Sequence, residues 1–276
     1  MACRVCLLNA EGLQPAPWSG DSLAATAPFE PADGVYTITN TYNTTRVLKL
    51  DAHLDRLEDS AARAGIPLTL DRPKLRAALR QMIEEAGWGD VRFRITVGRA
   101  QPETLILSIE PFHPLPAHLL TEGTRAITAP NSARHNPEAK TTDWALRRRQ
   151  LQEAMPAGIY DTFLLDAEGY LLEGLASNFY AILDGTLYTA GSGVLKGISQ
   201  QIVLEVAPQV LPVKLEAVHV SQVPQMQEAF LSSSSRGIVP VVEIDGIAIG
   251  DGRVGEKTKA LRHAYQAWVA AHLEEL

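Results

Sequence analysis

One lysine stands in a setting that suits nucleophilic chemistry. The chain has only seven lysines, and Lys140 lies between a polar loop over residues 131–138 and a helical pattern that runs to Met155. A lysine amine is a good Schiff-base nucleophile when a cleft at a domain boundary removes it from water. From its position alone a solvated loop lysine is the better interpretation, so a catalytic role depends on partners elsewhere.

Two features that follow Lys140 supply such partners. Glu173 ends an apolar strand pattern that begins at Tyr170, where a carboxylate is costly unless it is paired. Gly197-Ile198-Ser199 opens a predicted helix, whose first N–H groups can bind a phosphate. The ordinary alternatives are a glutamate on an edge strand and a helix start without a ligand. Together with an amine, however, a carboxylate and a phosphate site match one molecule, pyridoxal 5'-phosphate, through its aldehyde, ring nitrogen and phosphate.

Two other segments could bind an anion. Four serines at 232–235 precede Arg236-Gly237 and offer hydroxyls, amides and a guanidinium, although a polar loop is the ordinary interpretation. Arg56, in the run His53-Leu54-Asp55-Arg56-Leu57, is either a charge on a helix face or a fork for phosphate. Neither segment decides the function alone.

Several familiar patterns lack the context that their chemistry requires. Residues 250–255 match G-x-G-x-x-G, but a dinucleotide-binding unit needs a following βαβ segment and only 21 residues remain. Three arginines at 147–149 face different directions on a predicted helix and are expected on its surface. Cys3 and Cys6 form a C-x-x-C inside an alternating strand pattern, so a redox site is not expected. The seven histidines show no metal-binding spacing, so no metal site is expected.

Composition bounds the remaining possibilities. The 276 residues are 46% hydrophobic and 21% charged, which favours a folded globular protein over a disordered one. A net charge of −7 gives no electrostatic support for nucleic-acid binding. No run of about 18 apolar residues is present, so no membrane span is expected. The start Met1-Ala2-Cys3-Arg4 does not resemble a secretory signal, and two cysteines fit a reducing cytoplasm.

The first part of the chain predicts strands and helices in blocks, which is typical of an α+β domain. Asn43-Thr44-Thr45 joins two β-branched runs as a hairpin. Gly65 closes one helix, while Asp71 caps a second helix that ends at Gly87. The predicted strands are 35–42, 46–50, 91–97 and 104–109, and the predicted helices are 52–64 and 73–86.

A proline-rich segment at about 110–118 is the best linker and predicts two domains, 1–114 and 115–276. The second domain should contain many short strands, including a tight hairpin at Asp184-Gly185. The strand patterns that precede this hairpin span 160–166 and 170–173, and the predicted helices are 143–155, 199–207 and 256–273.

Four motifs together resemble the class IV, or fold-type IV, pyridoxal-phosphate enzymes. This family includes branched-chain aminotransferases, D-amino-acid aminotransferases and aminodeoxychorismate lyases. The resemblance runs from about Gly34 to the C-terminus and implies a small α/β N-terminal domain followed by a larger pseudo-barrel domain. The motifs are Gly34-Val35-Tyr36 with 53–57, 169–174 with Ser177-Asn178-Phe179, 195–199, and 230–241 with 252–258.

The resemblance also implies a role for each matching residue. Lys140 would form the Schiff base and shuttle the proton, and Glu173 would bind the pyridine nitrogen. The expected phosphate ligands are Arg56, Ile198, Ser199 and Ser234, and the expected substrate-binding residues are Tyr36, Arg94, Ser235 and Arg236. Arg94, Arg99 and Arg236 all remain open as partners of a substrate carboxylate.

The sequence departs from the family pattern at three places. Gln200 replaces the arginine that usually follows the phosphate turn, and Trp144-Ala145 stands where branched-chain enzymes carry a tyrosine. The segment 98–102 lacks the arginine and histidine carboxylate trap of D-amino-acid enzymes.

We therefore predict a cytoplasmic, homodimeric aminotransferase that moves an amino group between an amino acid and a 2-oxo acid by a ping-pong mechanism. A branched-chain-like L-amino acid is the favoured donor. The alternatives are a lyase of the aminodeoxychorismate type, a D-amino-acid or (R)-amine transaminase, and a non-catalytic binding protein.

Overall fold

The computed structural model describes residues 3–276, and its strands form two separate sheets. Met1 and Ala2, which begin the segment considered above as a secretory signal, lie outside the described residues. The chain forms two compact units. The first contains the residues up to His113 together with Ala139–Leu146 and His272–Leu276, and the second contains Pro114–Glu138 and Arg147–Ala271.

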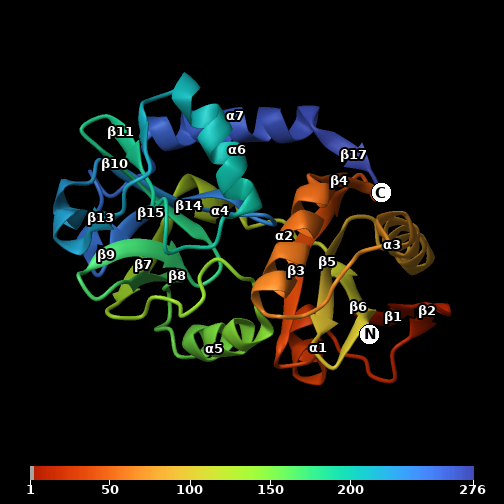
Figure 1. Cartoon of the computed structure of the whole chain (residues 1–276). Coiled ribbons are helices and arrows are strands. Elements are labelled where there is room, and N and C mark those ends of the chain that lie inside the picture. The colour runs from red at the N-terminus through yellow and green to blue at the C-terminus, as the bar shows by residue number, and fades with distance from the viewer. Residues whose placement is uncertain (1–2) are drawn as a thin grey trace. The chain divides into compact units, whose positions relative to one another are not determined.

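The first unit is built on a seven-stranded sheet in the order β17-β4-β3-β5-β6-β1-β2. Helices α2 and α3 supply the apolar residues that pack with β5 and β6 into one core, and α2 lies along β3 in Figure 1. The elements are β1 Arg4–Asn9, β2 Gly12–Pro15, α1 Leu23–Thr26, η1 Ala27–Phe29, β3 Gly34–Tyr42, β4 Arg46–Leu48, α2 Leu50–Arg63, α3 Arg72–Ala86, β5 Val91–Gly98, β6 Gln101–Pro111 and β17 Leu273–Glu275.

Local signals set the ends of these elements as predicted. The Asp71 side chain accepts a hydrogen bond from the Lys74 N–H and begins α3, and Gly87 ends it with a φ of 65°. Helix α2 begins two residues before the predicted position. The predicted hairpin between β3 and β4 is confirmed.

The second unit is a ten-stranded sheet in which six strands close on themselves. The ring runs through β10, β14, β15, β7, β8 and β9, and the pairing of Asn178 with Glu173 closes it. The elements are α4 Ala117–Thr121, β7 Thr124–Ala129, β8 Asp161–Leu165, β9 Tyr170–Gly174, β10 Asn178–Leu183, β11 Thr186–Tyr188, α6 Ile198–Val206, η2 Ala207–Gln209, β12 Val213–Lys214, β13 Val218–His219, η3 Val220–Gln225, β14 Glu228–Ser233, β15 Gly237–Ile244, β16 Ile247–Ala248 and α7 Glu256–Ala271.

This closed ring confirms the predicted pseudo-barrel, and the whole is the predicted α+β fold. Helices α6 and α7 cross and pack against each other (Figure 1), joined by a hydrogen bond from Trp268 to Glu205. Asp184 and Gly185 form the expected tight turn, both with positive φ. Helix α5 (Thr142–Glu153) begins in the first unit and ends in the second.

The prediction of one long C-terminal helix over 256–273 is wrong at its end. Helix α7 stops at Ala271, and Leu273 to Glu275 pair with β4 as strand β17. Leu273 is the last residue of the predicted helix, but its backbone pairs with Leu48 instead. The strand partner lies more than 200 positions away in the chain, so a local helical pattern could not reveal it.

The two cysteines are both free and buried. Cys3 packs in the cluster with Val5 and Leu23, whereas Cys6 packs in the core formed by α2 and α3. Burial raises the pKa of the Cys3 thiol to about 11. Thiols in this setting are not reactive nucleophiles. Among residues 3–276, no helix is long and apolar enough to cross a membrane.

Candidate functional site

Lys140 is fixed against the start of strand β3 in the first unit. Its carbonyl accepts a hydrogen bond from the Tyr36 N–H at 3.0 Å, and the next residue, Thr141, forms a β-bridge with Val35. Its own N–H donates to the Ser60 hydroxyl oxygen at 3.1 Å. The amine nitrogen lies 4.8 Å from the centre of the Tyr36 ring. Bonds on both sides of Lys140 therefore fix the backbone from which the amine extends.

Helix α2 brings two further basic side chains to this part of the first unit. His53 is fully buried, and its Nδ1 lies 2.9 Å from the Thr37 hydroxyl, to which Arg56 also donates at 3.4 Å. Burial, and then the positive charges of Arg56 and Lys140, hold the pKa of His53 well below its usual range. Burial also lowers the pKa of Arg56 to about 10. A neutral histidine beside two cations leaves positive surroundings, which suit a phosphate.

Strand β9 of the second unit holds Glu173, whose side chain is only 6% exposed. One carboxylate oxygen accepts a hydrogen bond from Arg134 at 3.3 Å, and the other accepts one from the Leu195 N–H at 3.1 Å. Asn178 donates to the Leu195 carbonyl at 2.9 Å. The peptide groups of Leu195 are therefore held from both sides, by residues of β9 and β10.

The same segment leads directly into helix α6. Gly197 is the N-cap residue and no side chain caps the helix, so the N–H groups at its start suit an anion. A Cβ on Gly197 would lie 2.1 Å from the Asn178 Oδ1, which explains the glycine. The Ser199 hydroxyl lies 2.9 Å from that of Tyr265 on α7. The buried carboxylate and the helix start thus belong to one hydrogen-bonded group of residues.

Contacts of Arg236 support the serine-rich turn between β14 and β15. Arg236 donates to the Ser233 hydroxyl at 2.7 Å and to the Ala176 carbonyl at 3.1 Å, and it covers the Tyr160 ring. Ser234 and Ser235 form the tip of this turn and are partly buried. Arg236 therefore acts as a support for the turn in this structure.

The arginines considered for the substrate carboxylate all have other partners. Arg94 is paired with the buried Glu30, which also accepts a hydrogen bond from Thr96 at 2.6 Å. Arg99 donates to the Ala64 and Gly65 carbonyls at the end of α2. Arg236 likewise has partners within the protein, so all three arginines are engaged in this structure.

Among the predicted site residues, Tyr36, Arg56 and Lys140 lie together in the first unit, whereas Arg94 is engaged with Glu30. The predicted residues of the second unit lie on two segments. Glu173, Ile198 and Ser199 lie on β9 and at the start of α6, and Ser234, Ser235 and Arg236 form the turn between β14 and β15.

Sequence reasoning missed four supporting residues. Ser60 lies four positions after Arg56 on the same helix, so helical spacing could have identified it. Asn178 was part of a recognised motif, but without a role. Arg134 and Tyr265 carry no local signal, since their partners Glu173 and Ser199 are distant in the chain.

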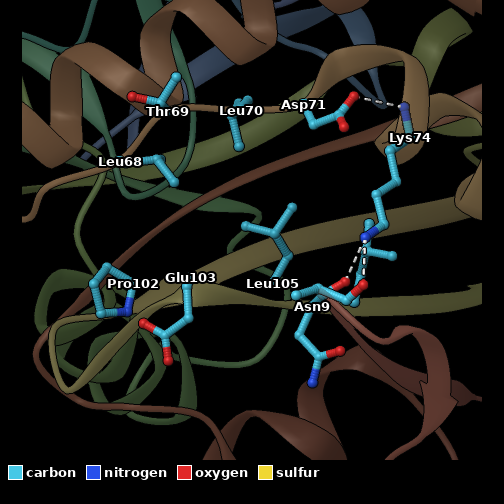
Figure 2. A pocket seen from close by; sticks show the side chains of 11 residues that line it. Asn9, Leu68, Thr69, Leu70, Asp71, Lys74, Pro102, Glu103 and Leu105 are labelled. Carbon is cyan, nitrogen blue, oxygen red and sulfur yellow. Dashed lines mark hydrogen bonds between the residues drawn. The ribbon is translucent and has the colours of Figure 1, made fainter.

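A hollow of about 170 Å³ in the first unit involves none of these residues. Figure 2 shows its apolar floor of Leu68, Leu70 and Leu105 and the Lys74 side chain at its edge. The Lys74 amine donates to the Asn9 carbonyl at 2.6 Å, so this lysine fastens a turn. The hollow therefore lies apart from the predicted site residues of the first unit. In the part of the chain that the structure describes, no group of three or more His, Cys, Asp or Glu residues could hold a metal ion.

Comparisons with known proteins point to one family. The family model described as amino-transferase class IV matches residues 34–244. A branched-chain-amino-acid aminotransferase of Pseudomonas aeruginosa is 27% identical over 263 residues, which cover 87% of this chain and 85% of that protein. A D-alanine aminotransferase of Bacillus licheniformis is 27% identical over 253 residues, covering 86% and 88%. The crystal structure of the T.th branched-chain amino acid aminotransferase with pyridoxamine 5'-phosphate has the same fold, with a TM-score of 0.85, 21% identity, and coverage of 100% and 99%.

Proposed function

Because the chain belongs to the class IV aminotransferase family and is a transaminase, we propose that it uses pyridoxal 5'-phosphate and prefers a branched-chain-like L-amino acid as donor. The observation that carries this proposal is the link between Glu173 and the start of α6. The Leu195 N–H binds the carboxylate, and Gly197 begins the helix two residues later. A ring nitrogen and a phosphate on one rigid molecule need such a fixed pair of partners.

The described residues fit this cofactor by their chemistry. When bound, pyridoxal 5'-phosphate supplies an aldehyde that links to amines and a ring that withdraws electrons. Glu173 is a buried acceptor for the ring nitrogen. The N–H groups of Ile198 and Ser199, the Ser234 hydroxyl and the Arg56 guanidinium would hold the phosphate.

Lys140 has two functions in this scheme. Its amine would bind the cofactor between turnovers, and it would then carry a proton to and from the α-carbon of the substrate. The backbone bonds to Tyr36 and Ser60 limit how far the amine can swing. The Tyr36 ring lies beside the amine, with its centre 4.8 Å from the nitrogen, and forms one wall of its surroundings.

The proposed donor rests on the relatives and on the engaged arginines. A branched-chain-amino-acid aminotransferase is among the relatives, and Arg94 and Arg99 are bound to Glu30 and to backbone carbonyls. The proposed substrate-binding residues are then Ser235 on the serine-rich turn of the second unit and Tyr36 in the first unit. D-Alanine is the second candidate donor, because D-alanine aminotransferases of similar identity are also relatives. We further propose a cytoplasmic homodimer, in accord with two free buried cysteines and with the family resemblance.

The test is a half-reaction assay on the purified protein. With L-leucine, the absorbance band of the bound cofactor should shift and a 2-oxo acid should appear, faster than with D-alanine. The Lys140→Ala variant should bind the cofactor without the Schiff-base band and should lose turnover, whereas the exposed Lys214→Ala variant should keep it. Turnover retained by Lys140→Ala would overturn the scheme, and pyruvate release without an amino acceptor would indicate the lyase alternative.

A further inference from the structure

We propose that Arg134 is a positioning residue that keeps the Glu173 carboxylate ionised and oriented for the ring nitrogen of the cofactor. This inference rests on the proposed function, because it assigns a task to Glu173 that only a bound pyridine ring would use. Arg134 belongs to the polar loop before Lys140 and matches none of the motifs in the sequence.

Each oxygen of Glu173 accepts a hydrogen bond from a fixed donor. Arg134 Nη1 reaches Oε1 at 3.3 Å, and the Leu195 N–H reaches Oε2 at 3.1 Å. The same Nη1 donates to the Pro137 carbonyl at 3.0 Å, which fastens the guanidinium to its own loop. A carboxylate oxygen can accept more than one hydrogen bond, so both oxygens keep capacity for a further partner.

Burial makes the charge of Arg134 essential to this arrangement. The side chains of Arg134 and Glu173 are only 4% and 6% exposed. A carboxylate removed from water becomes protonated unless a positive group stands beside it. A neutral carboxyl group could not serve as counter-ion to a protonated ring nitrogen. Loss of Arg134 should therefore weaken cofactor binding, and the weakening should grow as the pH falls.

The other charged groups near Glu173 in the second unit do not replace Arg134. Lys196, on the segment that holds Leu195, is exposed to solvent, as is His135 in the loop of Arg134. Asp161, beside Gly174, is itself satisfied by the Ser177 hydroxyl at 2.8 Å and by the Leu175 N–H at 3.0 Å. Arg134, by contrast, is a buried cation in direct contact with the Glu173 carboxylate.

The test is a titration of the apoprotein with pyridoxal 5'-phosphate, followed by absorbance and fluorescence between pH 5 and pH 9. The Arg134→Gln variant should bind the cofactor about tenfold more weakly at neutral pH, as expected for loss of a hydrogen bond to a charged group. Its affinity should begin to fall at a pH at least about one unit higher than in the wild type. Arg134→Lys retains the charge and should keep the wild-type pH midpoint. The matched control is Arg149→Gln, which removes an exposed arginine paired with Glu153.

A second background separates positioning from a general structural role. The Glu173→Gln variant has no carboxylate for Arg134 to keep ionised. Adding Arg134→Gln to this variant should therefore change the affinity for the cofactor by less than about twofold. An equal loss in both backgrounds, an unchanged pH midpoint in Arg134→Gln, or a shifted midpoint in Arg134→Lys would overturn the inference. If the wild-type apoprotein fails to bind the cofactor, the proposed function fails too. If the wild type binds the cofactor and Glu173→Gln weakens this binding, but Arg134→Gln leaves it unchanged, only the role of Arg134 fails.

Discussion

The backbone N–H of Lys140 donates a hydrogen bond to the side-chain oxygen of Ser60, at 3.1 Å. The Ser60 hydroxyl in turn donates to the Arg56 carbonyl at 2.7 Å, one turn earlier on α2. A single buried hydroxyl therefore ties the proposed Schiff-base lysine to the helix that carries the proposed phosphate arginine. All three residues belong to the first unit, so this link does not depend on how the two units are arranged.

Substitution of Ser60 by alanine should therefore impair catalysis without abolishing it. The variant leaves the Lys140 N–H without its acceptor, which typically costs about 1–3 kcal/mol for a buried group. We expect turnover to fall by roughly tenfold, the rate equivalent of about 1.4 kcal/mol, as the amine loses its fixed position. Steady-state kinetics and urea unfolding would measure both effects.

The matched control for Ser60 is Ser192→Ala in an exposed turn of the second unit. This control should change unfolding by no more than about 0.5 kcal/mol. Wild-type turnover in Ser60→Ala would show that the lysine backbone is held by its remaining bond to Tyr36 and by the bridge between Thr141 and Val35.

Stability should fall on acidification because of His53. Its pKa lies well below the usual value of 6.5 in the folded state, through burial and the nearby cations Arg56 and Lys140. Below pH 6.5 the unfolded chain binds a proton at this histidine that the folded chain does not bind. The contribution to stability is therefore present above pH 6.5 and declines as the pH falls, by up to about 1.4 kcal/mol for each unit.

Thermal unfolding of the apoprotein between pH 5 and pH 8 would measure this effect. The His53→Asn variant removes the titration and should show a flatter profile than the wild type over pH 5 to 6.5. His113→Asn, which alters an exposed histidine, should leave the wild-type slope unchanged. If the stability of the wild type and of His53→Asn falls equally between pH 6.5 and pH 5, groups other than His53 cause the loss of stability in acid.

Local chemistry made much of this fold predictable. Asp71 and Gly87 mark the ends of α3, and the Asp184-Gly185 turn marks a hairpin, since each depends on residues close in the chain. Strand β17 and the Arg134–Glu173 pair could not be predicted in this way, because each needs a partner that only the folded chain supplies. The division into domains 1–114 and 115–276 remains a prediction, which limited proteolysis near the linker would test.

Arg94 should prove to be a structural residue and not a ligand of the substrate. Its guanidinium binds the buried Glu30, so Glu30→Gln or Arg94→Met should each cost about 3–5 kcal/mol by leaving one charge buried alone. The double variant Glu30→Met/Arg94→Met should recover part of that loss. Urea unfolding would measure these changes. A stable Arg94→Met protein whose KM for amino acids rises about tenfold, equivalent to about 1.4 kcal/mol, would instead place Arg94 at the substrate carboxylate.

Substitution of Gly197 by alanine should be destabilising when Asn178 is present. The backbone of Gly197 has a φ of −69°, which alanine adopts readily, so only the contact of a new Cβ with the Asn178 Oδ1 at 2.1 Å opposes the substitution. Moving Asn178 away would break its bond to the Leu195 carbonyl, and with it the support of the segment that binds Glu173. Gly197→Ala should therefore destabilise the protein by about 1–3 kcal/mol and weaken cofactor binding.

The double variant Gly197→Ala/Asn178→Ala separates this clash from any need for glycine itself. Without the Asn178 side chain, the added methyl group has room, so Gly197→Ala should cost less than about 0.5 kcal/mol in that background. Urea unfolding of the four proteins in the cycle, with cofactor titration of each, would measure the coupling. An equal cost in both backgrounds would mean that the helix start needs glycine for a reason other than Asn178, such as close approach of the phosphate.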